Sequence, residues 1–357
     1  MLKVFHIISH FELGGAEKVA INISQSGNKE FEYHIVEVAR GYSPFSEEML
    51  KMLDKQGIYC HRSIIKLNKL AILFFPLRFL YLYLKYRPHI IHSHTEVPDL
   101  SVYLSFLLWK PIIRNCRIVR TIHNSQLWSG WDWIGRHVEY FFQKHHSNIA
   151  ISIATQQSYK KKYGIECPII YNGLSPIPAV RFEYIKPDRI NIVFAGRLEP
   201  QKGIDILTCI IKELKNNTQF FFHIIGDGHC KNQMLDQLKG CNNFQYYGKV
   251  YNLSAYLSSF DYLFMPSRYE GLALLAIEAS LAKLPVIINA CDGLEETLPN
   301  SWPYKVQNNS IEQYLSIFSS LDKQNSKKAG DMAFHFAIEH FSLSRMQTEY
   351  ETLYKRL

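Results

Sequence analysis

The stretch INIVFAGRLEPQKGIDIL, residues 190–207, decides the fold that we expect for this chain. INIVFA predicts a buried strand, a short loop between Gly196 and Gly203 follows, and IDIL begins a helical pattern. A second stretch of the same kind, YLFMPSRYEGLALLAIEAS (262–280), repeats the order of strand, loop and helix. Strands that alternate with helices in this way are typical of parallel α/β layers.

The alternation continues in both directions along the chain. Further apolar runs that predict strands are VFHIIS, YHIVEVA, HIIHSH, IVRTIH, NIAISI, FFFHIIG, FQYYG and PVIINA. Helical patterns separate them at 16–25, 46–56, 70–86, 97–108, 204–214, 231–238, 253–258 and 272–282. The sequence therefore predicts an α/β protein with two Rossmann-like doubly wound domains that face each other across a cleft.

Length and proline content suggest the domain boundaries. A chain of 357 residues is long enough for two cores, and SPIPAVRFEYIKPDR (175–189) contains three prolines without a clear period. We expect an N-terminal domain over 1–178, a linker over 179–189 and a second domain over 190–340. An amphipathic closing helix over 341–357 is expected to pack back on the N-terminal domain.

The net charge of +8 lies entirely in the first half of the chain, where residues 1–178 hold 21 Lys and Arg against 13 Asp and Glu. This asymmetry fits either an anionic membrane surface or a merely solvated basic face, and no nucleic-acid motif accompanies it. The apolar run LAILFFPLRFLYLYL (70–84) is too short to span a bilayer. It fits a buried helix or a helix that touches lipid. The N-terminus lacks the pattern of a signal peptide, and the seven scattered cysteines fit a reduced cytoplasmic protein.

Two pairs of charged residues stand where helices are expected to begin. Arg197 and Lys202 flank the loop after the first quoted strand. Glu270 precedes a helix expected to start near Gly271, and Glu278 would lie two turns inside that helix. Cations and backbone N–H groups at helix starts favour phosphate, whereas carboxylates accept hydrogen bonds from hydroxyls. The combination fits a sugar nucleotide.

The order of these motifs resembles the family-four retaining glycosyltransferases of the GT-B fold. The resemblance rests on GRLEPQKG, on EGLALLAIE, and on GGAEKVAINIS, PHIIHSH, TIHN, NIAIS, IIYNG, IIGDG and MPS, and it covers most of the chain in order. It implies an enzyme that moves a sugar from a nucleotide donor to an acceptor hydroxyl with retention of configuration. The acceptor suggested is a lipid-linked intermediate of a surface polysaccharide such as O-antigen or capsule. The expected location is the cytoplasm, peripheral on the inner face of the cytoplasmic membrane.

The resemblance also implies roles for single residues. Arg197 and Lys202 would hold the donor diphosphate, Glu278 the ribose and Glu270 the donor sugar. The remaining donor-side residues implied are Gly14, Gly15, Gly271 and Leu272. His123, which follows the expected strand IVRTI, would contact the reacting centre together with Glu270.

Aromatic and imidazole side chains add two further expectations. Trp128, Trp131 and Trp133 fit either an acceptor site, because indoles stack on sugars, or core packing. His89, His92 and His94 alternate along an expected strand, which is not the i, i+4 spacing of a helical metal site. We therefore expect no metal at these histidines, and the resemblance to GT-B enzymes implies that the protein needs no metal and no cofactor.

The pattern departs from the family at two places. Ala273 stands where glycine or proline is commoner, and LEETLPNSWPY after NACDG lacks the usual glycine-rich return, so that Glu295 and Glu296 have no firm role. Two alternatives remain open: a sugar-nucleotide epimerase on the same architecture, which needs no acceptor, and a non-catalytic sugar-nucleotide-binding protein. An NAD dehydrogenase is disfavoured because SHFELGGAE, not GxGxxG, follows the first strand.

Overall fold

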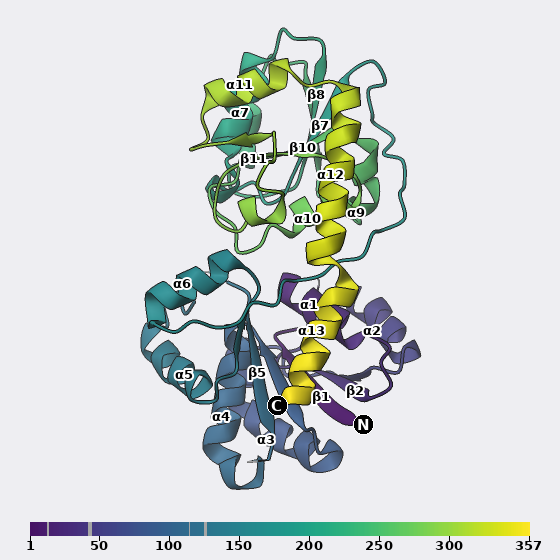
Figure 1. Cartoon of the computed structure of the whole chain (residues 1–357). Coiled ribbons are helices and arrows are strands. Elements are labelled where there is room, and N and C mark those ends of the chain that lie inside the picture. Colours follow the sequence, from purple (N-terminus) through teal and green to yellow (C-terminus); the bar gives the residue numbers. More distant parts are fainter. Residues whose placement is uncertain (13, 42–44, 114, 125–126) are drawn as a thin grey trace. The chain divides into compact units, whose positions relative to one another are not determined.

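The computed structural model describes residues 1–12, 14–41, 45–113, 115–124 and 127–357 (Figure 1). It divides into two compact units. The first contains Met1–Gly173 and Leu343–Leu357, and the second contains Leu174–Ser342. No helix in the described part of the chain is long and apolar enough to cross a membrane.

The first unit is built on a six-stranded sheet in the order β3-β2-β1-β4-β5-β6, in which all neighbouring strands are parallel. The strands are β1 (Leu2–Ile8), β2 (Phe31–Glu37), β3 (Tyr59–His61), β4 (Ile90–His94), β5 (Arg117–Ile122) and β6 (Asn148–Ala150). The helices are α1 (Gly15–Ser24), α2 (Phe45–Lys55), α3 (Asn68–Tyr86), α4 (Glu96–Ile113), α5 (Asp132–Lys144), α6 (Ile153–Tyr163) and α13 (Leu343–Arg356).

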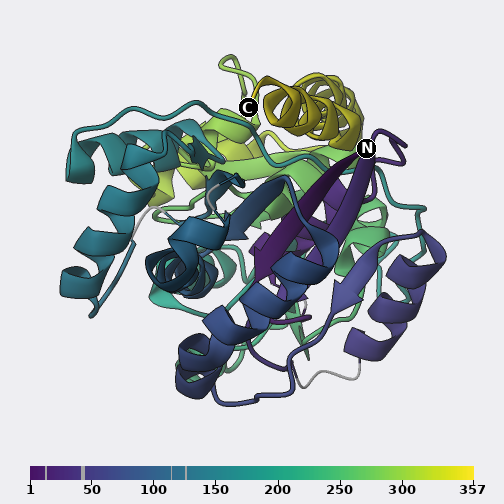
Figure 2. The same ribbon diagram turned by 90° about the horizontal axis from the view of Figure 1, so that it is seen from below.

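Helices cover both faces of this sheet because its central strands are apolar on both sides. Along β1, Val4 and Ile8 belong to a core shared with α1 and α13, whereas Phe5 and Ile7 belong to a core shared with α3, α4 and α5. Figure 2 shows the blue helices on the opposite side of the strands from the yellow C-terminal helix. Side chains alternate across a strand, so the near-continuous apolar runs of the sequence reflect burial on both faces.

The second unit repeats the design with the strand order β12-β11-β10-β7-β8-β9, again entirely parallel. The strands are β7 (Ile190–Ala195), β8 (Phe220–Ile225), β9 (Phe244–Gly248), β10 (Tyr262–Met265), β11 (Val286–Asn289) and β12 (Lys305–Val306). The α-helices are α7 (Ile204–Glu213), α8 (Lys231–Gln237), α9 (Leu253–Tyr256), α10 (Leu274–Leu281), α11 (Ile311–Ser319) and α12 (Lys323–Phe341). Short 3₁₀ turns are η1 (Pro200–Lys202), η2 (Leu257–Ser259) and η3 (Glu295–Thr297). The expectation of two Rossmann-like, doubly wound parallel sheets is confirmed.

Each sheet has a switch point, where chain connections leave in opposite directions along the sheet. It lies between β1 and β4 in the first unit and between β7 and β10 in the second. Ligands of doubly wound folds bind beyond the carboxyl ends of the strands at such points. The fold therefore draws attention to the loops that follow β1, β4, β7 and β10.

The residues expected to form a linker pack on the second unit. The Val180 N–H donates to the carbonyl of Ala255, the Phe182 N–H donates to the Ser259 hydroxyl, and the Phe182 ring is buried in the second core. At the other end, extended backbone at Ser342 ends α12, and α13 then packs against α1 of the first unit. The chain thus returns to the unit in which it began.

Candidate functional site

The site begins with two loops that lie side by side in the second unit although about 70 residues separate them. The loop after β7 carries Arg197 and Lys202, and the loop after β10 carries Glu270. The two strands are neighbours in the sheet, which brings the loops together. The Arg268 N–H donates to the carbonyl of Gln201 at 2.8 Å, and the Gln201 amide donates to the carbonyl of Tyr269 at 2.9 Å.

An ion pair joins the two loops at their centre. Lys202 Nζ donates to Glu270 Oε1 at 2.6 Å, and the side chains are only 18% and 8% exposed. Two of the four residues singled out by their charge thus meet directly. The pair places a fixed ammonium group and a fixed carboxylate at the switch point, one suited to phosphate and the other to hydroxyls.

Two glycines, one in the loop after β7 and one in the loop after β11, allow these loops to lie close to the loop after β10. A Cβ at Gly203 would lie 2.1 Å from the carbonyl oxygen of Pro266, and Gly203 has a φ of +69°. A Cβ at Gly293 would lie 2.3 Å from the carbonyl oxygen of Glu270. Any other residue at Gly203 would push apart the loops that hold Lys202 and Glu270, and any other residue at Gly293 would push the loop after β11 away from Glu270.

Arg197 lies at the exposed side of the same loop. Its guanidinium is exposed and donates to the Gln201 side-chain oxygen at 3.2 Å. Gln201 in turn holds the loop after β10, as described above. Arg197 therefore shares the loop of Lys202 without sharing its ion pair.

The helix that carries Glu278 begins later than the sequence suggested. α10 starts at Leu274, not near Gly271, so that Glu278 lies about one turn inside the helix and not two. The cause is a contact with the loop after β11: the Ala273 N–H donates to the carbonyl of Gly293 at 2.8 Å, which keeps the preceding backbone out of the helix. The carboxylate of Glu278 accepts a hydrogen bond from the Ser254 hydroxyl at 2.8 Å. Leu272 is buried and Gly271 is partly exposed at the bend.

The corresponding edge of the first unit contains the other expected residues. Gly14 caps α1, Gly15 is its first residue, and His123 follows the last residue of β5. The Ser9 and Thr95 hydroxyls, from the loops after β1 and β4, hydrogen-bond at 3.0 Å. The loops on either side of the first switch point are therefore tied together.

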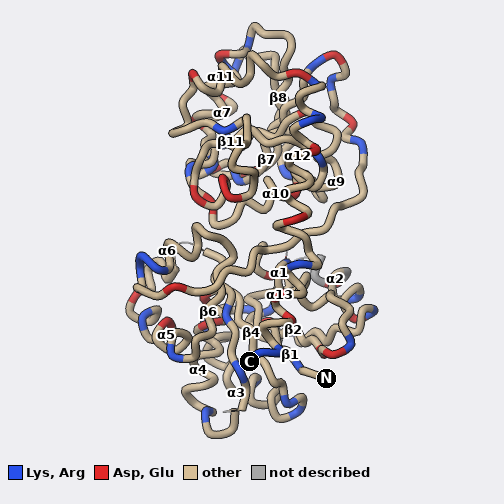
Figure 3. The backbone as a smooth tube through the Cα atoms, in the orientation of Figure 1, with Lys and Arg blue, Asp and Glu red and all other residues tan. Residues whose placement is uncertain are grey.

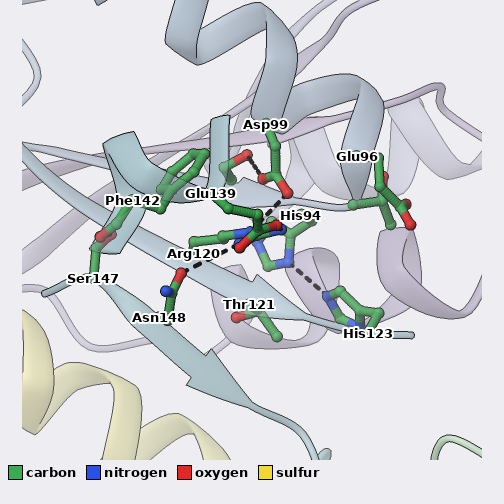
Figure 4. A network of polar contacts seen from close by, with 12 residues as sticks. His94, Glu96, Asp99, Arg120, Thr121, His123, Glu139, Phe142, Ser147 and Asn148 are labelled. Carbon is green, nitrogen blue, oxygen red and sulfur yellow. Dashed lines mark hydrogen bonds and ion pairs between the residues drawn. The ribbon is translucent and has the colours of Figure 1, made fainter. Parts of the chain in front are cut away.

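Four histidines form a chain of contacts beneath this edge. His94 hydrogen-bonds with His6 at 3.0 Å. It also hydrogen-bonds with His123 at 3.1 Å (Figure 4). His92 hydrogen-bonds with the hydroxyls of Tyr354 at 2.6 Å and Thr121 at 2.7 Å. Burial lowers the pKa of His6 and of His123 to about 3, and burial also lowers the pKa values of His92 and His94. The imidazoles are accordingly neutral at pH 7.

His6, His92 and His94 each offer a ring nitrogen, and these atoms lie within 4.8 Å of one another. Both nitrogens of His92 already hydrogen-bond with hydroxyls, whereas the Nε2 atom of His6 is buried without a hydrogen-bond partner among the described residues. His89, in contrast, is exposed and accepts the N–H of Lys3. The expectation that the protein needs no metal stays a prediction.

A buried arginine supports the strand that leads to His123. Arg120 Nε donates to Asp99 at 2.7 Å, and its two terminal nitrogens donate to both oxygens of Glu139 at 2.7 Å (Figure 4). Burial raises the pKa of Asp99 to about 7 in spite of Arg120. Burial also opposes ionisation of Glu139, but Arg120 and the hydrogen bonds from Trp128 and Tyr159 outweigh it and lower that pKa. This network ties β5 to α4 and α5.

The three tryptophans separate in the structure. Trp128 is 4% exposed, and its indole N–H donates to Glu139 at 2.7 Å, so its proposed place on the acceptor side is wrong: a buried ring has no free face for a sugar. Trp131 and Trp133 are 45% and 75% exposed at the start of α5. Only these two remain candidates for contact with a ligand.

Several residues of these sites were not anticipated from the sequence. Gln201 and Tyr269 join the two loops, and Ser254 holds Glu278. His6 completes the histidine cluster because β1 and β4 pair with His6 opposite His92. A signal was present, since both strands carry histidine on the same face, but the strand pairing was needed to read it.

Comparison with protein families gives two matches. Residues 13–176 match the family described as Glycosyltransferase Family 4, and residues 189–317 match the family described as Glycosyl transferases group 1. The first match covers most of the first unit and ends three residues into the second, and the second match lies within the second unit.

Two proteins that are similar in sequence and one that is similar in structure illustrate the degree of similarity. A Klebsiella pneumoniae protein described as an uncharacterized 41.2 kDa protein in the cps region is 32% identical over 52% of this chain and 54% of its own length. The capsular polysaccharide biosynthesis glycosyltransferase CapH of Staphylococcus aureus is 28% identical over 78% of this chain and 79% of its own. The crystal structure of HepE from Anabaena with UDP and glucose superposes with a TM-score of 0.75 at 16% identity, with full coverage of both chains.

Proposed function

This chain belongs to the family-four glycosyltransferases, and we propose that it transfers a sugar from a nucleotide-sugar donor to an acceptor hydroxyl with retention of anomeric configuration. The observation that carries the proposal is the ion pair between Lys202 and Glu270 at the switch point of the second sheet. It supplies a cation for a diphosphate and a carboxylate for sugar hydroxyls from two adjacent loops.

The donor-binding roles follow from the chemistry of each group. Lys202 and the exposed Arg197 bind the diphosphate, the first as a point charge and the second through paired donors. Glu270 accepts hydroxyls of the transferred sugar, and Glu278 accepts the ribose hydroxyls. The backbone of Gly271 and Leu272 lies at the bend before α10, where N–H groups favour an anion.

We place two further groups of the first unit near the reaction by resemblance to the family. His123 contacts the transferred sugar, and its low pKa makes it a neutral hydrogen-bonding group at pH 7. Gly14 and Gly15, at the start of α1, present backbone to the donor phosphates. Support for these roles is their position at the carboxyl edge of the first sheet.

Retention fits a reaction in which the departing diphosphate itself takes the acceptor proton. Lys202 and Arg197 stabilise the charge that develops on the leaving group, an effect worth on the order of 100- to 1,000-fold in rate for one preorganised donor. Glu270 is held by Lys202 and is therefore oriented to bind hydroxyls. The acceptor attacks from the face that the diphosphate leaves.

The proposed acceptor is a glycan or lipid-linked glycan of a surface polysaccharide. Its support is the similarity to a capsular polysaccharide glycosyltransferase and the basic first half of the chain. The reaction would take place in the cytoplasm, with the protein peripheral on the inner face of the cytoplasmic membrane.

Donor binding is the first test. Thermal unfolding in the presence of UDP-, GDP- and ADP-sugars identifies the donor, because a ligand at 100 times its Kd stabilises the folded state by about 2.7 kcal/mol. The identified donor is then incubated with a lipid-linked acceptor in the presence of EDTA. We expect transfer without metal and a product with the anomeric configuration of the donor. A changed sugar still attached to nucleotide would indicate an epimerase, and binding without turnover would contradict an enzyme.

A further inference from the structure

The outer surface of α3 and α4 is apolar, where a surface helix normally presents polar residues to water. Nine large apolar side chains of these helices are 43–65% exposed. They recur at the three- and four-residue spacing of a helix face, and we call them the apolar face: Leu70, Leu73, Phe74, Leu77, Tyr81 and Leu84 of α3, with Leu107, Leu108 and Ile112 of α4. The sequence of α3 contains no acidic residue.

The two helices form one continuous surface. α3 and α4 pack against each other, and the indole N–H of Trp109 on α4 donates to the carbonyl of Pro76 on α3 at 3.0 Å. Both helices also pack on the same core of the first unit. The inward faces of the helices are therefore already buried, and the apolar face is what remains exposed.

A groove between α4 and α5 opens next to this face. It has a volume of about 680 Å³, within the range of pockets that hold small molecules. Its walls are aromatic, with Tyr103 and Phe106 from α4 and Phe141 from α5, and Leu107 belongs both to the groove and to the apolar face. The apolar surface thus continues into a pocket.

Three cations surround the groove. Lys110 on α4 and Arg136 and Lys144 on α5 line it and are exposed, and no Asp or Glu is among its lining residues. Burial lowers the pKa of His145 at the groove, and the nearby charges of Lys110 and Lys144 lower it further. Among the described residues, none of the three cations forms an ion pair within the chain. Figure 3 shows the Lys and Arg residues of this unit in blue.

We propose that the apolar face and this groove dock on an anionic phospholipid bilayer, with one acyl chain in the groove and its phosphate on Lys110, Arg136 and Lys144. This proposal rests on the proposed function, because transfer to a membrane-bound acceptor requires that the enzyme reach the bilayer. A phosphate can accept two hydrogen bonds from one guanidinium, and cations beside an apolar helix face are the pattern of interfacial helices. Trp133 on α5 is exposed and lies three residues before Arg136 in the sequence. Tryptophan side chains favour the boundary between lipid and water.

Co-sedimentation with vesicles tests the docking surface directly. The full chain is mixed with vesicles of phosphatidylglycerol and phosphatidylcholine, or of phosphatidylcholine alone, at low and at high salt. We expect sedimentation only with the anionic vesicles and weaker binding at high salt. Lys110→Glu/Lys144→Glu should weaken binding by about tenfold or more. Leu73→Ser/Leu77→Ser, which removes apolar surface without adding charge, should weaken binding at low and at high salt alike.

A matched control places the same charge change elsewhere. Lys212→Glu/Lys215→Glu reverses two exposed lysines at the end of α7 and just beyond it, in the second unit, and should bind vesicles as the unaltered protein does. Equal loss in this control would show a general charge effect and overturn the proposal, as would equal binding to phosphatidylcholine alone. Thermal stabilisation by the nucleotide-sugar donor is measured on every variant. If it persists while vesicle binding is absent in all proteins, the docking surface fails and the proposed donor site stands.

Discussion

The two units share one architecture but place their charged side chains at different depths. In the second unit, Lys202 and Glu270 meet at the carboxyl edge of the sheet, where a ligand can reach them. In the first unit, Arg120 lies fully buried with Asp99 and Glu139 beneath the edge. The difference suggests two uses of the same fold: charges at the edge bind, whereas charges below it hold the strands and loops in place.

The largest effect should come from breaking the buried network. Arg120→Met leaves the carboxylates of Asp99 and Glu139 buried without their cation, and we expect a loss of about 3–5 kcal/mol in the free energy of unfolding. Urea unfolding followed by circular dichroism measures this loss, and tryptophan fluorescence assigns it to the first unit, because four of the five tryptophans lie there.

The control for this change is an ion pair at the surface of the second unit. Arg268 pairs with Asp205 through two hydrogen bonds, but both side chains are largely exposed. Arg268→Met should therefore cost no more than about 1 kcal/mol. Similar small costs for Arg120 and Arg268 would show that the first unit does not depend on its buried charges.

A change at the edge of the second unit should act chiefly on activity, with a smaller loss of stability than Arg120→Met because Lys202 and Glu270 are not fully buried. Lys202→Met removes the cation assigned to the diphosphate, and Glu270→Gln removes the charge of the carboxylate assigned to the sugar. We expect either change to lower the rate of sugar transfer by roughly 100- to 1,000-fold, or about 2.7–4 kcal/mol. Lys202→Met should also abolish thermal stabilisation by the donor.

Lys212→Met, at an exposed position on α7, should retain full activity. Turnover of the Lys202 and Glu270 variants at the rate of this control would remove the ion pair from the mechanism. The charged residues at the edge of the second sheet would then have no demonstrated role in binding or catalysis, and the functional difference between the two units would not hold.

The tryptophans sharpen the same contrast within the first unit. Trp128→Phe keeps an aromatic ring but removes the N–H that Glu139 accepts, and a hydrogen bond to a charged group contributes about 1.5–3 kcal/mol. Trp133→Phe, at a side chain that is 75% exposed, should change the free energy of unfolding by less than about 0.5 kcal/mol. Urea unfolding followed by circular dichroism measures both. Equal costs would contradict the assignment of Trp128 to the network.

The sequence predicted the parts of the fold that depend on local pattern. Long apolar strands were expected, whereas the edge strands β3 and β12, of three and two residues, carry too little pattern to be recognised. α12 was also missed because it is largely polar and contains Gly330. In the structure, a Cβ at Gly330 would lie 2.0 Å from the carbonyl oxygen of Lys283, so the glycine serves close helix packing and does not end the helix.

The site could be predicted only as separate pieces. The charges of Lys202 and Glu270 were visible in the sequence, but their pairing depends on β7 and β10 being neighbours, which only the sheet order shows. The burial of Trp128 likewise depends on Glu139, eleven residues further on and in a helix that the sequence had not indicated. Long-range packing, not local preference, decides these contacts.

Acid should destabilise the first unit through its histidine cluster. The pKa of His6 is lowered to about 3 by burial, below the ordinary value of 6.5, so the unfolded chain binds a proton between these values and the folded chain does not. The contribution of neutral His6 to the free energy of unfolding is therefore fully present above pH 6.5 and is lost as the pH drops towards 3. For each such histidine the slope approaches about 1.4 kcal/mol per pH unit, and the partners of the cluster are hydroxyls and imidazoles that cannot neutralise an imidazolium.

Substitution of one histidine of the cluster measures its contribution to the pH dependence of stability. His6→Gln keeps a hydrogen-bonding group for His94 but does not titrate, so the slope of unfolding free energy between pH 6 and pH 4 should fall by about 1.4 kcal/mol per pH unit. His335→Gln, at an exposed histidine of α12 in the second unit, should leave the slope unchanged. An unaltered slope in His6→Gln would mean that the cluster admits protons without cost. Burial of the polar groups would then not distinguish the first unit from the second, because a buried histidine that is protonated without a loss of stability behaves as an exposed histidine does.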